Sequence, residues 1–221
     1  MTPETKRLAA SPRAYQLKVT LQNVRPPIWR RFTVRDDITL HKFHGLLQAI
    51  MGWTDSHLHQ FVSGGTRFSR PEFDLPTPQH DDGRARLRDV LKKPNDRLTY
   101  EYDFGDGWEH VVVLEQVLQH EPRARYPVIL AGKRACPPED CGGAHGYGHL
   151  LEVLASPDHP EHKDLGEWAG EDFDSDRFDV GALNRSFHGG WYLPGEVEPS
   201  TADRRPRSPQ TTLQLGAGKR R

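Results

Sequence analysis

The chain has 221 residues, of which 35% are hydrophobic, and its 31 acidic and 30 basic side chains give a formal net charge of −1. This balance gives no sign of a nucleic-acid or membrane partner, and no apolar run approaches the roughly 20 residues that a membrane helix needs. The N-terminus lacks the apolar core of a signal peptide and the chain has only two cysteines, so we expect a cytoplasmic protein rather than a disulfide-rich secreted one.

The first part of the chain predicts two strands and a helix. Residues 15–21 alternate between apolar and polar side chains, as a half-buried strand does, and residues 28–34 form an antiparallel partner after two prolines. Apolar side chains then recur at helical spacing over residues 40–51, with Thr39 as the predicted N-cap and Gly52 as the predicted end. We expect the apolar face of this helix to pack across the sheet.

The rest of the chain predicts strands first and helices later. We expect a strand at residues 57–62, an excursion loop at 70–84 and a short helix at 87–91. A hairpin at 98–118 and a last short strand at 126–130 follow. A loop rich in Cys, Pro and Gly then follows at residues 135–146. Three helices complete the predicted elements, at residues 148–155, 160–169 and 180–187.

These elements together predict an α+β fold with a mostly antiparallel or mixed sheet. The ββα opening is compatible with a grasp-like sheet around one helix, with helices on one side and a helical C-terminal part. We divide the chain into a loose lead-in at residues 1–13, a single α+β domain at 14–193 and a disordered, basic and polar tail at 194–221.

Chemically capable side chains gather at the tip of the predicted hairpin. A Gly-Asp-Gly turn joins the two strands, with Asp103 and Asp106 around it and Trp108 and His110 just after it. Carboxylates and an imidazole suit a divalent transition metal or acid-base chemistry near neutral pH. An ordinary turn also uses Asp and Gly, and Trp108 can belong to the core, so a purely structural role is the alternative.

A second observation extends this candidate site. His57 and His59 alternate along a predicted strand, which places both imidazoles on one face. We hypothesise that they share a concave polar surface with the hairpin tip and bind one zinc or manganese ion there. The candidate ligands of this site are His57, His59, Asp103, Asp106 and His110.

Two further groups are candidates for binding. A zinc-stabilised loop is one interpretation of the Cys-rich segment, and idle reduced thiols or a redox pair are the alternatives. Its candidate ligands are Cys136, Cys141, His145 and His149. Trp29 and Arg30, which precede Arg31, are candidates for contact with an anionic partner, although such residues are also common on an ordinary strand.

Four motifs occur in a fixed order along the chain. They are IWRR at residues 28–31, HLHQF at 57–61, YDFGDGWEH at 102–110, and CPPEDCGG with a following Gly-Tyr at 136–147. Over roughly residues 14–193 the sequence resembles the Ri-plasmid (pRiA-type) ORF-three-like family, whose members are also known as insertion-sequence passenger proteins under a resolvase-like name. The resemblance implies an α+β domain in a bacterial or archaeal setting, often linked to mobile elements, and it implies no established activity.

Two functions from different classes are compatible with the sequence. The first is a non-catalytic or cryptic binding module that contacts a protein or nucleic-acid partner through the surface around Trp108. The alternative is a metal-dependent hydrolase, for example of phosphodiesters, in which the Asp and His side chains at the hairpin tip hold one ion that activates water. The sequence contains no Gly-rich phosphate loop, no His-Glu-x-x-His helix and no nucleophile elbow, so we rank the binding module first.

Overall fold

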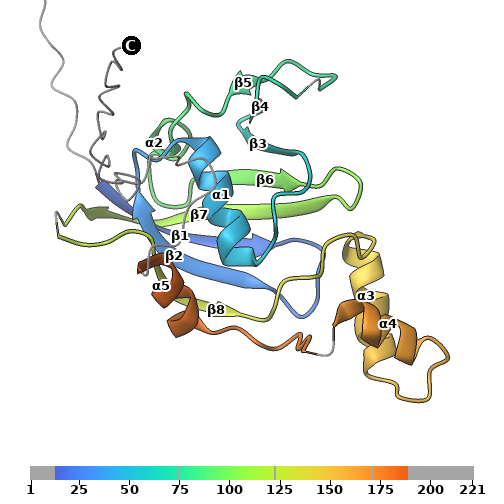
Figure 1. Ribbon diagram of the computed structural model, residues 1–221. Helices are drawn as coiled ribbons and strands as arrows, with labels where there is room; N and C mark the ends of the chain where they lie inside the picture. The colour runs from blue at the N-terminus through green and yellow to red at the C-terminus, as the bar shows by residue number, and fades with distance from the viewer. Residues whose placement is uncertain (1–12, 74, 122, 171, 189–221) are drawn as a thin grey trace, which may run out of the picture.

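The structure is a computed structural model that describes residues 13–188, apart from residues 74, 122 and 171 (Figure 1). Most of the predicted lead-in and the whole predicted tail lie outside the described residues. The strands are β1 (Arg13–Leu21), β2 (Trp29–Arg35), β3 (His59–Ser63), β4 (Thr66–Ser69), β5 (His80–Asp81), β6 (Arg97–Tyr102), β7 (Trp108–Gln119) and β8 (Val128–Lys133). The helices are α1 (Leu40–Met51), α2 (Leu87–Val90), α3 (Gly143–Leu154), α4 (His162–Ala169) and α5 (Val180–His188).

One eight-stranded sheet, in the order β5-β4-β3-β6-β7-β1-β2-β8, forms the core. Its neighbouring strands are antiparallel except for β4 and β5, which are parallel. The predicted α+β class and the mostly antiparallel sheet are therefore confirmed. No helix in the described part of the chain is long and apolar enough to span a membrane.

The ββα opening forms because its apolar side chains recur every second residue in β1 and β2 and at the 3.6-residue period of a helix in α1. β1 and β2 pair with Tyr15 opposite Val34, and the apolar side chains that alternate along both strands are buried. In α1, the Thr39 hydroxyl accepts a hydrogen bond of 3.3 Å from the Lys42 backbone, and Gly52 ends the helix at a φ of 98°. α1 lies across one face of the sheet, where its apolar side chains are buried (Figure 1). The predicted helix, its cap and its end are confirmed.

The structure differs from the sequence-based boundaries at several places, and it adds the strand β4, which was not predicted. β3 begins at His59, so His57 lies in the preceding loop. The predicted excursion loop at 70–84 contains the two-residue strand β5. α3 begins at Gly143, five residues before the predicted start, because a glycine-rich run hides the helical period.

Loops that carry the sequence motifs meet at one end of the sheet, which we call the loop end (residues 52–58, 103–107 and 134–142). The Asp103 backbone donates a 2.9 Å hydrogen bond to Leu58, and the Trp53 indole donates a 3.0 Å bond to the Pro137 carbonyl. A Cβ atom on Gly143 would lie 2.4 Å from the backbone oxygen of Asp106, so only glycine allows this approach of α3 to the hairpin tip. The motifs thus fix how the three loops pack together.

Candidate metal centre

Three side chains with metal-ligand chemistry meet beside α1, and we call them the inner cluster: His44, Asp55 and His59. Each offers one ligand atom, and these atoms all lie within 4.8 Å of one another. The imidazole rings of His44 and His59 stack with 3.5 Å between their centroids, and His44 Nε2 lies 2.6 Å from Asp55 Oδ1. Two imidazoles and one carboxylate are a ligand set suited to zinc or manganese.

A second aspartate lies directly behind the inner cluster. His59 Nε2 is 3.0 Å from Asp82 Oδ2, and the two residues are 2% and 0% exposed. Among the described residues, His59 Nδ1 and Asp82 Oδ1 have no hydrogen-bond partner. Buried polar atoms without partners cost free energy, and a cation bound between these groups would offset that cost.

Hydrogen bonds to neighbouring side chains fix the orientation of the ligands. The Tyr100 hydroxyl lies 2.8 Å from His44 Nδ1 and accepts a 2.9 Å hydrogen bond from Gln48. Without a metal, His44 donates from Nε2 to Asp55 and accepts at Nδ1 from the Tyr100 hydroxyl. A metal at Nε2 would require the other tautomer, in which Nδ1 donates to the same hydroxyl oxygen. Asp55 has a φ of 59°, and its backbone N–H donates a 2.9 Å hydrogen bond to the Gln48 side chain. An uncommon left-handed backbone conformation is thus held in place.

Burial and local charges set the protonation of the inner cluster. Burial lowers the pKa of His59 and outweighs its hydrogen bond to Asp82, so the imidazole is neutral near pH 7. Burial acts to raise the pKa of Asp55, but the hydrogen bond from His44 and the nearby imidazoles bring that pKa below its ordinary value. A neutral imidazole and an ionised carboxylate are the forms that bind metals.

The inner cluster faces a cavity of about 490 Å³ with a basic wall. His41, Arg70 and Phe73 line this cavity together with His57. One guanidinium nitrogen of Arg70 lies 3.2 Å from both ring nitrogens of His41. Burial, and then the charge of Arg70, lower the pKa of His41. The positive charge on this wall therefore belongs to Arg70. Its Nε atom lies 3.4 Å from Glu72, and 38% of its side chain stays exposed, where it suits an anionic ligand.

A second group, the outer cluster, lies at the hairpin tip and consists of His57, Asp103 and Asp140. His57 Nε2 is 3.2 Å from Asp140 Oδ1 and 3.7 Å from Asp103 Oδ2. Glu139 places a third carboxylate 3.8 Å from the same nitrogen. Asp103 and Asp140 have φ values of 53° and 57°. Like Asp55, both aspartates thus adopt a backbone conformation that concentrates at functional sites in proteins.

The five predicted hairpin ligands do not form one site, and that prediction is wrong. His57 and Asp103 meet in the outer cluster, whereas His59 belongs to the inner cluster. The reason is that β3 begins only at His59. His57 lies in the loop before the strand, so the alternation of side chains along a strand does not place it on the same face as His59.

The other two hairpin residues have separate neighbours. Asp106 accepts a 3.2 Å hydrogen bond from the Gly142 backbone, which ties the hairpin tip to the start of α3. His110 is fully buried, with its ring edge-on to Trp53. Its Nδ1 atom lies 3.3 Å from the backbone oxygen of Tyr100, so this histidine belongs to the core.

The predicted contact surface around Trp108 is also wrong. Trp108 and Arg30 are each 1% exposed, so neither side chain can contact a partner. Trp108 packs against Trp53 with 5.8 Å between ring centroids. Trp29 lies on the opposite face of β2 from Arg30, half-buried beneath the ammonium group of Lys18, 5.0 Å from its ring centroid.

The predicted four-ligand zinc loop does not form within the described residues. Cys136 and Cys141 are free thiols, and no metal-competent group of three there includes either of them. Burial raises the pKa of both thiols, that of Cys141 to about 12, which disfavours the thiolate that binds zinc. His149 instead pairs with Glu161 at 3.2 Å. Idle reduced thiols, one of the alternative interpretations, agree with this arrangement.

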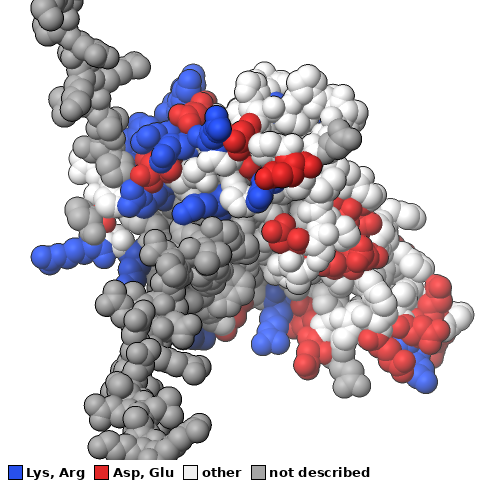
Figure 2. All heavy atoms as spheres, turned by 45° about the horizontal axis from the view of Figure 1, so that its top comes forward, with Lys and Arg blue, Asp and Glu red and all other residues white. Residues whose placement is uncertain are grey.

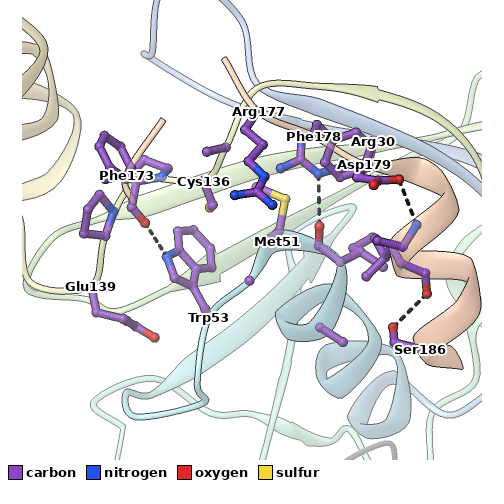
Figure 3. Close-up of a pocket in the computed structure, with 18 of the residues that line it drawn as sticks. Arg30, Met51, Trp53, Cys136, Glu139, Phe173, Arg177, Phe178, Asp179 and Ser186 are labelled. Carbon is purple, nitrogen blue, oxygen red and sulfur yellow. Dashed lines mark hydrogen bonds between the residues drawn. The ribbon is translucent and has the colours of Figure 1, made fainter. Parts of the chain in front are cut away.

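A hollow of about 680 Å³ lies between the end of α1, the Cys-rich loop and α5 (Figure 3). Arg30 lies at its base, where it donates hydrogen bonds of 3.0 Å to the Ile50 carbonyl and 2.8 Å to the Lys133 carbonyl. The Phe178 ring covers the guanidinium at 3.9 Å. Burial lowers the pKa of Arg30 to about 10, so the group stays charged at neutral pH. Arg30 therefore joins α1, β2 and β8.

The comparisons with known proteins place the chain in a family without an established activity. Residues 13–182 match the family described as plasmid pRiA4b ORF-3-like protein. The chain belongs to the plasmid pRiA4b ORF-3-like family. An uncharacterized protein of Sinorhizobium fredii (strain NBRC 101917 / NGR234), y4hQ, is 38% identical over 173 residues, which cover 77% of this chain and 89% of y4hQ.

A similar solved structure has the same α+β fold. The crystal structure of MM3350, a protein of unknown function from Methanosarcina mazei Go1, superposes with a TM-score of 0.71 at 37% identity. The match covers 76% of this chain and 95% of MM3350. The α+β fold of this pRiA4b ORF-3-like chain is thus shared with an archaeal protein.

Sequence reasoning missed three residues of the candidate centre in this pRiA4b ORF-3-like chain. His44 was counted only as part of an amphipathic helix, and Asp82 only as part of a loop. Asp55 precedes His57 and His59 at alternate positions, and this Asp-x-His-x-His pattern is the signal that could have drawn attention to it. The pairing of His59 with Asp82 has no such local signal, because 23 residues separate the two.

Burial of His110 predicts a loss of stability in acid. Its pKa falls from 6.5 to about 4 in the folded protein, mainly through desolvation. The unfolded chain therefore binds a proton that the folded chain does not between these pH values, so the free energy of unfolding should fall as the pH drops from about 6.5 to about 4. His110 alone should contribute about 3 kcal/mol of this loss. Denaturant unfolding at pH 7 and pH 4.5 should show a smaller loss for His110→Asn, and equal losses would contradict the assignment.

Proposed function

We propose that this protein is a metal-dependent hydrolase whose divalent ion, zinc or manganese, is held by the inner cluster. The observation that carries the proposal is the convergence of His44, Asp55 and His59 ligand atoms within 4.8 Å. These side chains come from α1, from the loop after it and from β3, so the tertiary fold assembles the set. The partnerless buried atoms of His59 and Asp82 support the same conclusion.

The expected chemistry is hydrolysis of an anionic ester. A divalent ion bound by this ligand set lowers the pKa of water and so supplies a nucleophile near neutral pH. The water oxygen forms a bond to phosphorus, the bond to the ester oxygen breaks, and a proton passes to the leaving oxygen. His57 lines the same cavity and is the candidate for that proton transfer, while Arg70 on the wall binds the anionic group.

The hydrolase proposal replaces the binding module that the sequence placed first, whose contact surface lay around Trp108. Binding of an anionic ligand remains part of the proposal. The buried positions of Trp108 and Arg30 remove the surface on which a non-catalytic module was predicted. A phosphodiester hydrolase would suit the mobile-element setting that the family resemblance implies. We keep that setting and the cytoplasmic location as parts of the proposal.

The test combines metal analysis with a small chromogenic diester. Protein purified without a histidine tag is dialysed against EDTA, and hydrolysis of bis(p-nitrophenyl) phosphate is measured with and without added manganese or zinc. We expect hydrolysis only with metal, and a loss of at least about 100-fold in Asp55→Asn. Equal rates in the wild type and Asp55→Asn, or no metal-dependent rate with either ion, would contradict the hydrolase assignment.

A further inference from the structure

The near-neutral net charge conceals a separation of charge across the molecule. Residues 84–97 carry six basic side chains and only two acidic ones, although the whole chain has a net charge of −1. In Figure 2, Lys and Arg side chains gather on the side of the molecule that holds α2, and Asp and Glu side chains prevail toward α3 and α4. We call the first region the basic face, and its side chains are Arg84, Arg86, Arg88, Lys92, Lys93 and Arg97.

The basic face is built on a rigid part of the fold. All of its side chains are exposed except that of Arg88, which is half-buried. Beneath them, Leu87 and Leu91 are 0% exposed and anchor the segment in the core. The Asp96 carboxylate accepts hydrogen bonds of 2.7 and 3.0 Å from the backbone of Lys92 and Lys93. The two lysines therefore point outward from a fixed turn rather than from a loose chain.

The basic face adjoins the cavity of the inner cluster through the first turn of α1. His41 lines that cavity, and its backbone N–H donates a 3.1 Å hydrogen bond to the carbonyl of Asp82. The next residue, Lys42, lines a separate hollow of about 420 Å³ together with Arg35 and Arg86. Asp37 lines the same hollow and pairs with Arg35 at 2.6 Å, so basic side chains lie between the exposed turn and the start of α1 with part of their charge neutralised.

We propose that the basic face binds the phosphate backbone of a nucleic acid and presents its phosphodiesters to the inner cluster. The second half of this statement rests on the proposed hydrolase function, whereas the first half does not. A cluster of exposed Lys and Arg side chains neutralises phosphates and carries no base-reading information. We therefore expect binding with little sequence preference, weakened by salt.

Binding is measured by fluorescence anisotropy with labelled 20-nucleotide DNA and RNA, single- and double-stranded, on the full chain in EDTA. Affinity should fall steeply between 50 and 200 mM salt, and the double variant Lys92→Glu/Lys93→Glu should weaken binding by roughly tenfold or more. Lys163→Glu is the control for loss of an exposed lysine, because Lys163 lies on α4, 83% exposed, away from the basic face. We expect this control to bind like the wild type.

The outcomes separate the two proposals. Unchanged affinity in the double variant would contradict binding by the basic face. This holds also if the nucleic acid binds to another part of the chain. Binding to vesicles of phosphatidylserine with none to DNA or RNA would overturn it as well. Binding in EDTA that depends on Lys92 and Lys93, followed by cleavage when manganese is added, supports both proposals. The same binding without cleavage supports the basic face and counts against the hydrolase.

Discussion

Adding zinc or manganese at about a hundredfold excess over Kd should raise the melting temperature of the wild type by about 5–10 °C. Under the proposed function, the ion would bind the folded state, in which His44, Asp55 and His59 are brought together, and not an unfolded chain in which they are apart. Asp55→Asn should lose this rise. Asparagine keeps the size of aspartate and the Asp55 side chain is 37% exposed, so the metal-free variant should still fold. Differential scanning fluorimetry with and without each ion measures the effect.

Two further aspartate variants locate the ion. Asp106→Asn alters a residue that contacts the start of α3 and lies outside both clusters, so it should keep the full rise. Asp103→Asn alters the outer cluster and should also keep it. A rise that persists in Asp55→Asn but disappears in Asp103→Asn would place the ion at the hairpin tip and contradict the inner cluster. A wild type that responds to neither ion would contradict both clusters.

Arg30→Met should lower the free energy of unfolding by about 3–5 kcal/mol. Methionine fills much of the same volume, so the loss reflects the missing guanidinium rather than an empty cavity. Without that group, the carbonyls of Ile50 and Lys133 lose their charged donors in a buried position. The Phe178 ring also loses the cation 3.9 Å from its centroid.

The neighbouring arginine provides a matched control. Arg31 lies on the opposite face of β2 and forms a two-bond pair with Glu115, at 2.7 and 2.8 Å, while 34% of its side chain remains exposed. Arg31→Met should therefore cost about 1 kcal/mol or less. Urea unfolding of both variants measures the difference. Similar losses for the two would mean that Arg30 does not join α1, β2 and β8 as the structure indicates.

Local patterns predicted the parts of the fold that depend on one segment. The alternation in residues 15–21 and 28–34 identified β1 and β2. Helical spacing and the caps identified α1. The start of α3 was missed, since Gly143 and Gly146 are present for close backbone contacts and have no apolar side chain to show a period.

The candidate site was less accessible to such patterns. Asp103, His57 and His59 were identified as metal-competent from their side chains, but the sequence could not assign them to separate clusters. That division depends on where β3 begins and on how β3 pairs with β6, where His59 lies opposite Tyr102. The burial of Trp108 and Arg30 could not be predicted from their own segments. It results from contacts with residues more than 20 positions away in the chain, Trp53 for Trp108 and Phe178 for Arg30.

The sequence by itself determined the fold class, the family and the residue types available for chemistry, since periodicity, caps and motifs are written in neighbouring residues. Only the tertiary structure decided which of these groups meet. His44 comes from a helix, Asp55 from a loop, His59 from a strand, and Asp82 lies beyond β5. Their approach results from packing α1 across the sheet, which buries apolar surface over the whole domain and is not specified by any one segment.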